Sequence, residues 1–162
     1  MVVLGDFQTS VRKALDEIDP NWEKYEGLVI CGTHQPRSEE IDYLIHKIRK
    51  AREDNTPYLG ICYGMQLGAV EYARNVLKIE DATSEEFGEG TFVVKKRKEG
   101  LNVGLKNGES YWNNYEVDLP DWKIPANFFI SQFHPEYQSS KEKPHPLLKN
   151  FIEYAKEHTM AM

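Results

Sequence analysis

Cys62 lies between two glycines in Gly60-Ile61-Cys62-Tyr63-Gly64, a spacing typical of a nucleophile at a sharp strand-to-helix turn. An apolar run suited to a buried strand precedes it, and apolar residues at helical spacing follow it as far as Leu77. A helix N-terminus supplies partial positive charge and free N–H groups, which favour the reactive thiolate. The N–H of Tyr63 would point toward a developing oxyanion. Taken alone, the pattern leaves open an inert buried cysteine, a common fate for this residue.

The second chemical pattern is His134-Pro135-Glu136, directly after an apolar stretch at residues 127–133. Residues two apart on an extended segment project to the same side, so the Glu136 carboxylate could hold the imidazole of His134. Taken alone, the pair of His134 and Glu136 favours an ordinary surface loop over a catalytic site. Combined with Cys62 earlier in the chain, it favours a Cys-His-carboxylate triad in which His134 activates the thiol.

The elements that would position these residues alternate between strands and helices. Strands are predicted at residues 1–7, 27–32, 57–62 and 127–133. Helices are predicted after a cap at Thr9 or Ser10, after a cap at Ser38, at residues 65–77 and from about Pro146. Residues 22–26 are too short and polar for a further strand. The alternation predicts an α/β fold of three layers, with a mostly parallel central sheet between flanking helices. Ligands bind such sheets at the carboxyl ends of the strands, where Cys62 and the loop after Gly32 would lie.

The segment between Leu77 and residue 127 has a different character. Residues 79–87 are predicted to form a polar connection. Residues 91–95 and 102–105 read as short strands around a turn, and residues 111–118 as another strand, irregular at Asn113 and Asn114. This region predicts a short antiparallel strand addition to the main sheet.

Size and composition restrict the classes of function. The 162 residues predict a single domain, and the formal net charge of −6 argues against nucleic acid or an anionic membrane as partner. The basic run Lys95-Lys96-Arg97-Lys98 is expected on an exposed surface. Two cysteines give no disulfide framework, and no closely spaced Cys or His pairs predict a metal or other cofactor. Without an apolar leader or spanning segment, a cytoplasmic location is expected.

Several motifs in order resemble the class I glutamine amidotransferase domain, and within that family the glutaminase domain of CTP synthase. They span the chain from about Tyr25 to the last helix: residues 57–66, 72–77, 82–87 and 132–137. The resemblance implies a flavodoxin-like amidotransferase fold over residues 1–162, without a synthetase domain. It also implies a free-standing enzyme that hydrolyses the side-chain amide of glutamine, or of a related amide, through a thioester and releases ammonia.

The resemblance also implies roles for individual residues. Cys62 would be the nucleophile, His134 the general acid and base, and Glu136 the residue that orients it. The backbone at Gly32, Thr33 and Tyr63 would form the oxyanion hole. The substrate-binding positions would be Gln66, Glu86 (facing the substrate's amino group) and Asn114.

Two departures from the family pattern affect substrate binding. The family's oxyanion loop reads Gly-Gly-Phe-Gly, whereas this chain has Cys31-Gly32-Thr33-His34, whose Thr and His resist dihedrals that glycine allows. The family grips the glutamine carboxylate with an Arg in an Arg-His-Arg-Tyr run, but the aligned residues here are Trp112-Asn113-Asn114-Tyr115. Arg37 or His34 are the candidates to replace that charge.

Two functions therefore stand as alternatives. The first is an active amidotransferase that supplies ammonia to a separate synthetase. The second is a diverged, weak or inactive homologue that acts as a binding or regulatory module. The sequence also leaves open a homo-oligomer.

Overall fold

The computed structural model describes all residues, 1–162, and centres on a four-stranded parallel sheet. Its strands, β1 (Val2–Leu4), β2 (Leu28–Ile30), β3 (Tyr58–Ile61) and β9 (Phe128–Ser131), lie in the order β1-β2-β3-β9. The register pairs Ile30 with Gly60 and Gly60 with Ile130, so all strands end at one edge. The predicted fold class is confirmed.

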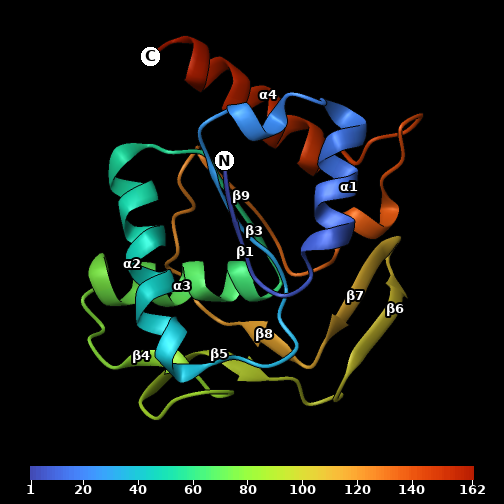
Figure 1. Cartoon of the computed structure of the whole chain (residues 1–162). Coiled ribbons are helices and arrows are strands. Elements are labelled where there is room, and N and C mark those ends of the chain that lie inside the picture. The colour runs from blue at the N-terminus through green and yellow to red at the C-terminus, as the bar shows by residue number, and fades with distance from the viewer.

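Helices cover both faces of the sheet (Figure 1). Helices α1 (Gln8–Ile18) and α4 (Pro146–Met160) lie on one face, and α2 (Ser38–Asp54) and α3 (Tyr63–Asn75) on the other. Alternation along β2 separates two cores, because Val29 packs with α1 and α4 while Leu28 and Ile30 pack with α2 and α3.

A buried ion pair joins α2 to α3. The guanidinium of Arg52 donates to both carboxylate oxygens of the fully buried Glu71, at 2.8 and 2.9 Å, and the side chain of Asn75 donates to Glu71 as well. This bidentate geometry satisfies a charge that would otherwise be costly to bury.

The strand addition lies below the main sheet and α3 in Figure 1. It consists of a sheet of β4 (Ala82–Ser84), β5 (Thr91–Lys96) and β8 (Tyr115–Val117), and a hairpin of β6 (Asn102–Lys106) and β7 (Glu109–Asn113). The antiparallel pairs are β5 with β8 and β6 with β7, while β4 runs parallel to β5.

Three details of the sequence prediction were wrong. Residues 79–87 contain the buried strand β4, and β5 and β6 each pair with another strand and not with one another. The helix caps also differ from the prediction. The cap position of α1 is Phe7, directly before Gln8, and that of α2 is Arg37, directly before Ser38. Neither Phe7 nor Arg37 makes a side-chain hydrogen bond that caps its helix. Residues 22–24 form a 3₁₀ helix, in agreement with the strand predicted to be missing there.

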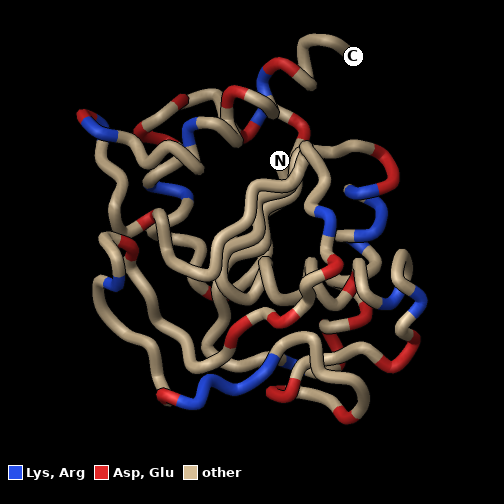
Figure 2. The backbone as a smooth tube through the Cα atoms, turned by 180° about the vertical axis from the view of Figure 1, so that it is seen from behind, with Lys and Arg blue, Asp and Glu red and all other residues tan.

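Charged residues of both signs are distributed along the chain (Figure 2). The longest basic stretch, along the lower edge of that view, is the Lys95–Lys98 run, in which Lys95, Lys96 and Lys98 are exposed. No helix is long and apolar enough to cross a membrane.

Candidate active site

Cys62 occupies a sharp turn between β3 and α3 with an unusual backbone conformation, φ 55° and ψ −99°. A non-glycine residue at positive φ is strained and is a feature of functional turns. Gly64 makes the turn possible, because a Cβ there would collide with the backbone carbonyl of Ile30. The buried hydroxyl of Tyr58 braces the turn by donating to the Gly64 carbonyl at 2.6 Å.

The pairing of β3 with β9 brings the two halves of the site together. The N–H of Cys62 donates to the carbonyl of Ser131 at 2.7 Å, and His134 follows three residues later at the same sheet edge. The Nδ1 atom of His134 lies 2.9 Å from Oε2 of Glu136, and both side chains are buried. The structure thus brings Cys62, His134 and Glu136 into one cluster.

The β6–β7 hairpin holds the segment that carries His134. The N–H of His134 donates to the carbonyl of Ser110 on β7. The N–H of Ser110 donates to Oε1 of Gln138, at the end of the 3₁₀ helix η2 (Pro135–Gln138), at 2.8 Å. These reciprocal contacts restrict where the imidazole can lie.

The electrostatics of the cluster favour a protonated imidazole. Burial alone would lower the pKa of His134, but the neighbouring Cys62, together with the hydrogen bond to Glu136 and the charge of that carboxylate, outweighs it and raises the pKa to about 9. A protonated imidazole beside a sulfur favours the thiolate. The second carboxylate oxygen of Glu136 is buried and has no hydrogen-bond partner, so the ion pair with His134 is its main compensation.

Cys31 lies in a different environment, although it also follows a strand of the same sheet. It is completely buried, and burial, with a smaller contribution from the charge of Glu136, raises the pKa of its thiol to about 12. Cys62 instead lines a pocket.

The pocket beside Cys62 has a volume of about 140 Å³. It brings together most of the predicted binding residues, which come from four separate parts of the chain: Thr33, Cys62, Tyr63, Gln66, Glu86 and Asn114. Gly32 does not line the pocket; it lies beside the triad, where an added Cβ would be 3.2 Å from Cε1 of His134. Gln66 is almost fully buried, and its side chain makes no hydrogen bond within the chain.

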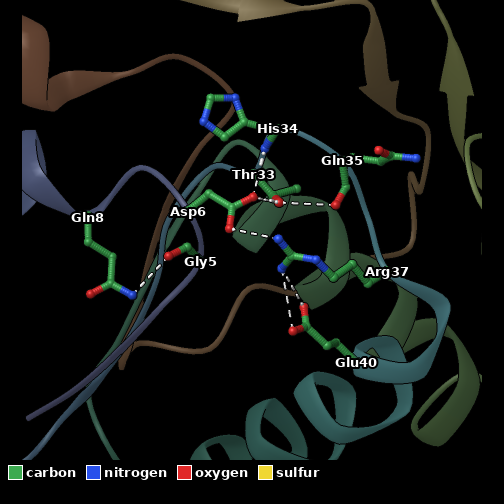
Figure 3. A network of polar contacts seen from close by, with 8 residues as sticks. All are labelled: Gly5, Asp6, Gln8, Thr33, His34, Gln35, Arg37 and Glu40. Carbon is green, nitrogen blue, oxygen red and sulfur yellow. Dashed lines mark hydrogen bonds and ion pairs between the residues drawn. The ribbon is translucent and has the colours of Figure 1, made fainter.

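A polar network holds the loop from Gly32 to Arg37 (Figure 3). One carboxylate oxygen of Asp6 accepts from the Thr33 hydroxyl at 2.6 Å and from the N–H of His34 at 3.0 Å. These hydrogen bonds, with that of Thr33 foremost, lower the pKa of Asp6, and nearby Arg37 adds to the effect. An N–H of the loop is therefore occupied by a carboxylate.

The backbone of the loop agrees with the expectation that Thr33 and His34 avoid the dihedrals that glycine allows, because neither residue has a positive φ. Arg37 does not replace the missing charge: its guanidinium pairs with Asp6 at 3.4 Å and Glu40 at 3.3 Å and does not line the pocket. His34 does line the pocket, but it is exposed and its ring packs edge-on against Phe7.

The sequence prediction missed two residues of the site. The side-chain amide of Gln132 donates to Sγ of Cys62 at 3.6 Å. Its position two residues before His134 on an extended segment was the available signal. Asp6 lies two residues after the end of β1, at the ligand-binding edge of the sheet, and this position was the available signal for it.

Comparison with known proteins agrees with this geometry. Residues 4–131 match the family described as "Glutamine amidotransferase class-I", and the chain belongs to that family. It is related to CTP synthases: it is 33% identical over 183 residues to that of Methanoculleus marisnigri and 30% identical over 179 residues to that of Methanoregula boonei. These alignments cover 82% and 80% of this chain but only 34% of each relative, so the chain spans about a third of their length.

A solved structure shares the fold. The glutaminase domain of Trypanosoma brucei CTPS with bound acivicin superposes with a TM-score of 0.71 at 20% sequence identity. The match covers 97% of this chain and 94% of that one. The likeness therefore extends over the whole α/β domain and its strand addition.

Proposed function

We propose that this chain is an amide hydrolase of the glutamine amidotransferase type, with Cys62, His134 and Glu136 as its triad. The observation that carries the proposal is the strained turn at Cys62 beside a buried His134–Glu136 pair, in a chain of this family. Glutamine, or an amide related to it, is the proposed substrate.

The proposed reaction has two halves. The thiolate of Cys62 attacks the amide carbon, the C–N bond breaks, and ammonia leaves with a proton from His134. Water then gives a proton to His134 and attacks the thioester, which releases the acid and restores the thiol. Glu136 keeps the imidazole oriented in both halves.

The proposed oxyanion donors are the N–H of Tyr63 at the start of α3 and an N–H of the loop at Gly32 and Thr33. Gln66, Glu86 and Asn114 are the proposed substrate contacts, because Gln66 and Glu86 bring polar groups with no partner in the chain to the pocket, and Asn114 lies in its wall. The 162 residues act as one amidotransferase domain in this proposal, and a synthetase that consumes the ammonia is the proposed partner.

One observation favours the alternative, a non-catalytic binding module. Asp6 accepts from the N–H of His34 and so fixes the loop that carries the proposed oxyanion donor, and no Lys or Arg lines the pocket to hold a substrate carboxylate. Removing one oxyanion donor typically costs about 10²–10³ in rate. A module that binds an amide without cleaving it would retain the pocket and lose turnover.

A steady-state ammonia-release assay separates the two functions. Purified protein is given a series of primary amides, glutamine among them, and compared with Cys62→Ala and with Cys31→Ala as the matched cysteine control. Release that persists in Cys31→Ala and disappears in Cys62→Ala supports the enzyme. Saturable binding of an amide without any release supports the module.

A further inference from the structure

The charged groups around the pocket are unevenly distributed. Glu86 is the only carboxylate in the lining, and no Lys or Arg side chain reaches it. His34 is the only basic side chain there, and it is exposed to solvent, which screens its charge.

Glu86 has no partner within the chain. Its carboxylate makes no hydrogen bond or ion pair, and only its backbone N–H is engaged, with the Ser84 hydroxyl. Glu86 is exposed to solvent, yet the surrounding protein partly desolvates its carboxylate and raises its pKa. Its charge also contributes to the raised pKa values of Tyr63 and Tyr115, two other residues of the pocket wall. A cationic donor at this place would gain a charge-assisted hydrogen bond.

Two asparagines of the pocket lining offer acceptors. The Asn113 side chain is nine-tenths buried, and its Nδ2 donates to the Gln132 carbonyl at 3.4 Å. This contact leaves Oδ1 of Asn113 as the atom without a partner. Asn114 beside it is also an uncharged amide.

The nearby guanidinium groups are already paired with carboxylates elsewhere. Arg37 pairs with Asp6 and Glu40 behind the loop, as Figure 3 shows. Arg97 pairs with Glu99 and Glu116 and lines a neighbouring cavity instead. A substrate carboxylate would therefore lie close to Glu86 without a cation to compensate it, which is costly in a partly desolvated site.

We propose that this pocket selects a primary amide that carries an amino group and lacks a carboxylate, so that glutamine itself is a poor ligand. This deepens the proposed function and rests on the same pocket. Glu86 is the specificity-determining residue for the amino group, and the uncharged wall at Asn114 disfavours the carboxylate.

Three amides of matched length test the selectivity. L-glutamine carries both groups, 4-aminobutanamide is glutamine without its carboxylate, and glutaramate is glutamine without its amino group. Dissociation constants are measured by calorimetry on Cys62→Ala, which cannot turn the ligands over, and kcat/KM for ammonia release is measured on the unaltered chain. We expect 4-aminobutanamide to bind at least about tenfold more tightly than glutamine, and glutaramate to bind most weakly of the three. A tenfold difference in the dissociation constant corresponds to about one charge-assisted contact.

Two variants in the Cys62→Ala background assign the effect to its residues. Glu86→Gln should remove most of the preference for 4-aminobutanamide over glutaramate, and Asn114→Arg should shift the preference toward glutamine. His46→Gln, at an exposed position outside the pocket, serves as control and should preserve the wild-type order.

The outcomes keep the two proposals apart. If 4-aminobutanamide binds best and no amide is hydrolysed, the selectivity stands and the enzymatic proposal fails. If ammonia is released with glutamine as the best substrate and ligand, the enzyme stands and the selectivity is overturned. Binding of glutamine as tightly as 4-aminobutanamide, or of none of the three amides, also overturns the selectivity.

Discussion

At the scale of single residues, two cysteines of one sheet differ in everything that governs thiol chemistry. Cys62 has a strained backbone, a helix N-terminus, a neighbouring imidazole and an opening to a pocket. Cys31 has none of these and is completely buried, with a pKa of about 12. Both cysteines follow apolar strands, but the sequence predicted the difference because only Cys62 lies between two glycines and directly before a predicted helix.

We expect iodoacetamide to modify Cys62 at least about 100-fold faster than Cys31 in the folded protein. A thiol with a pKa near 12 has only about 10⁻⁴ of its population as thiolate at pH 8. Peptide mapping after a time course measures both rates. His134→Gln should slow the reaction of Cys62 about tenfold, and His46→Gln, at an exposed position, should leave it unchanged. Preferential modification of Cys31 would reverse the assignment.

The raised pKa of His134 also predicts how stability depends on pH. Because the pKa rises from an ordinary value of 6.5 to about 9 on folding, the folded state holds an extra proton between these values. The stabilisation is complete below about pH 6.5 and is lost as the pH rises through about 9, with an upper limit of about 3 kcal/mol.

Urea titrations at a series of pH values from 6 to 9.5 measure this contribution to the free energy of unfolding. The unaltered chain should lose stability over this range, and His134→Gln should lose markedly less. His46→Gln should behave as the unaltered chain does. Parallel curves for all three proteins would show that His134 is not stabilised as a cation.

At the scale of elements, the sequence predicted the parts whose periodicity reflects local burial. Helix α2 was predictable because Ile41, Leu44, Ile45 and Ile48 follow helical spacing toward one core. Strand β4 was missed because Ala82, Thr83 and Ser84 form no apolar run, and their burial depends on the packing of α3 above them. The pairing of β6 with β7, and the bracing of His134 by that hairpin, depend on contacts that no local pattern records.

The loop between β2 and α2 shows that the sequence also failed to predict a long-range contact within the site. Its sequence predicted that Thr33 and His34 resist the dihedrals that glycine allows, in agreement with their ordinary dihedrals in the structure, but it did not predict the hydrogen bond from the N–H of His34 to Asp6. That contact spans 28 residues and crosses the sheet edge, so it could not be read from the loop alone.

We expect Asp6→Ala to raise the rate of amide hydrolysis at least about tenfold. The change removes the carboxylate that holds the N–H of His34, so the loop that carries the proposed donors at Gly32 and Thr33 can turn an N–H toward the oxyanion. Arg37→Gln is the matched control, since it removes the ion pair and keeps the Asp6 hydrogen bonds. Initial rates of ammonia release, with circular dichroism to verify folding, provide the measurement. A folded Asp6→Ala protein with an unchanged or lower rate would show that this contact does not limit the site.

At the scale of the whole molecule, the site forms where three parts of the fold meet. The parallel sheet supplies Cys62 and His134, the β6–β7 hairpin fixes the His134 segment, and the connection after β4 contributes Glu86. The family match over residues 4–131 includes Cys62 and Glu86 but ends before His134, whereas the fold shared with a glutaminase domain covers 97% of the chain. The proposed chemistry at Cys62 would therefore depend on the whole fold and not on a single motif.

The most direct test of the triad is the capture of a thioester on Cys62. Hydroxylamine intercepts an acyl group on sulfur, so amide turnover in its presence should yield a hydroxamate, detected by mass spectrometry, even if the thioester never accumulates. With 4-aminobutanamide or glutamine, we predict a hydroxamate from the unaltered chain and from Cys31→Ala, and none from Cys62→Ala or His134→Ala. Ammonia released without hydroxamate, at a rate that Cys62→Ala leaves unchanged, would contradict the account.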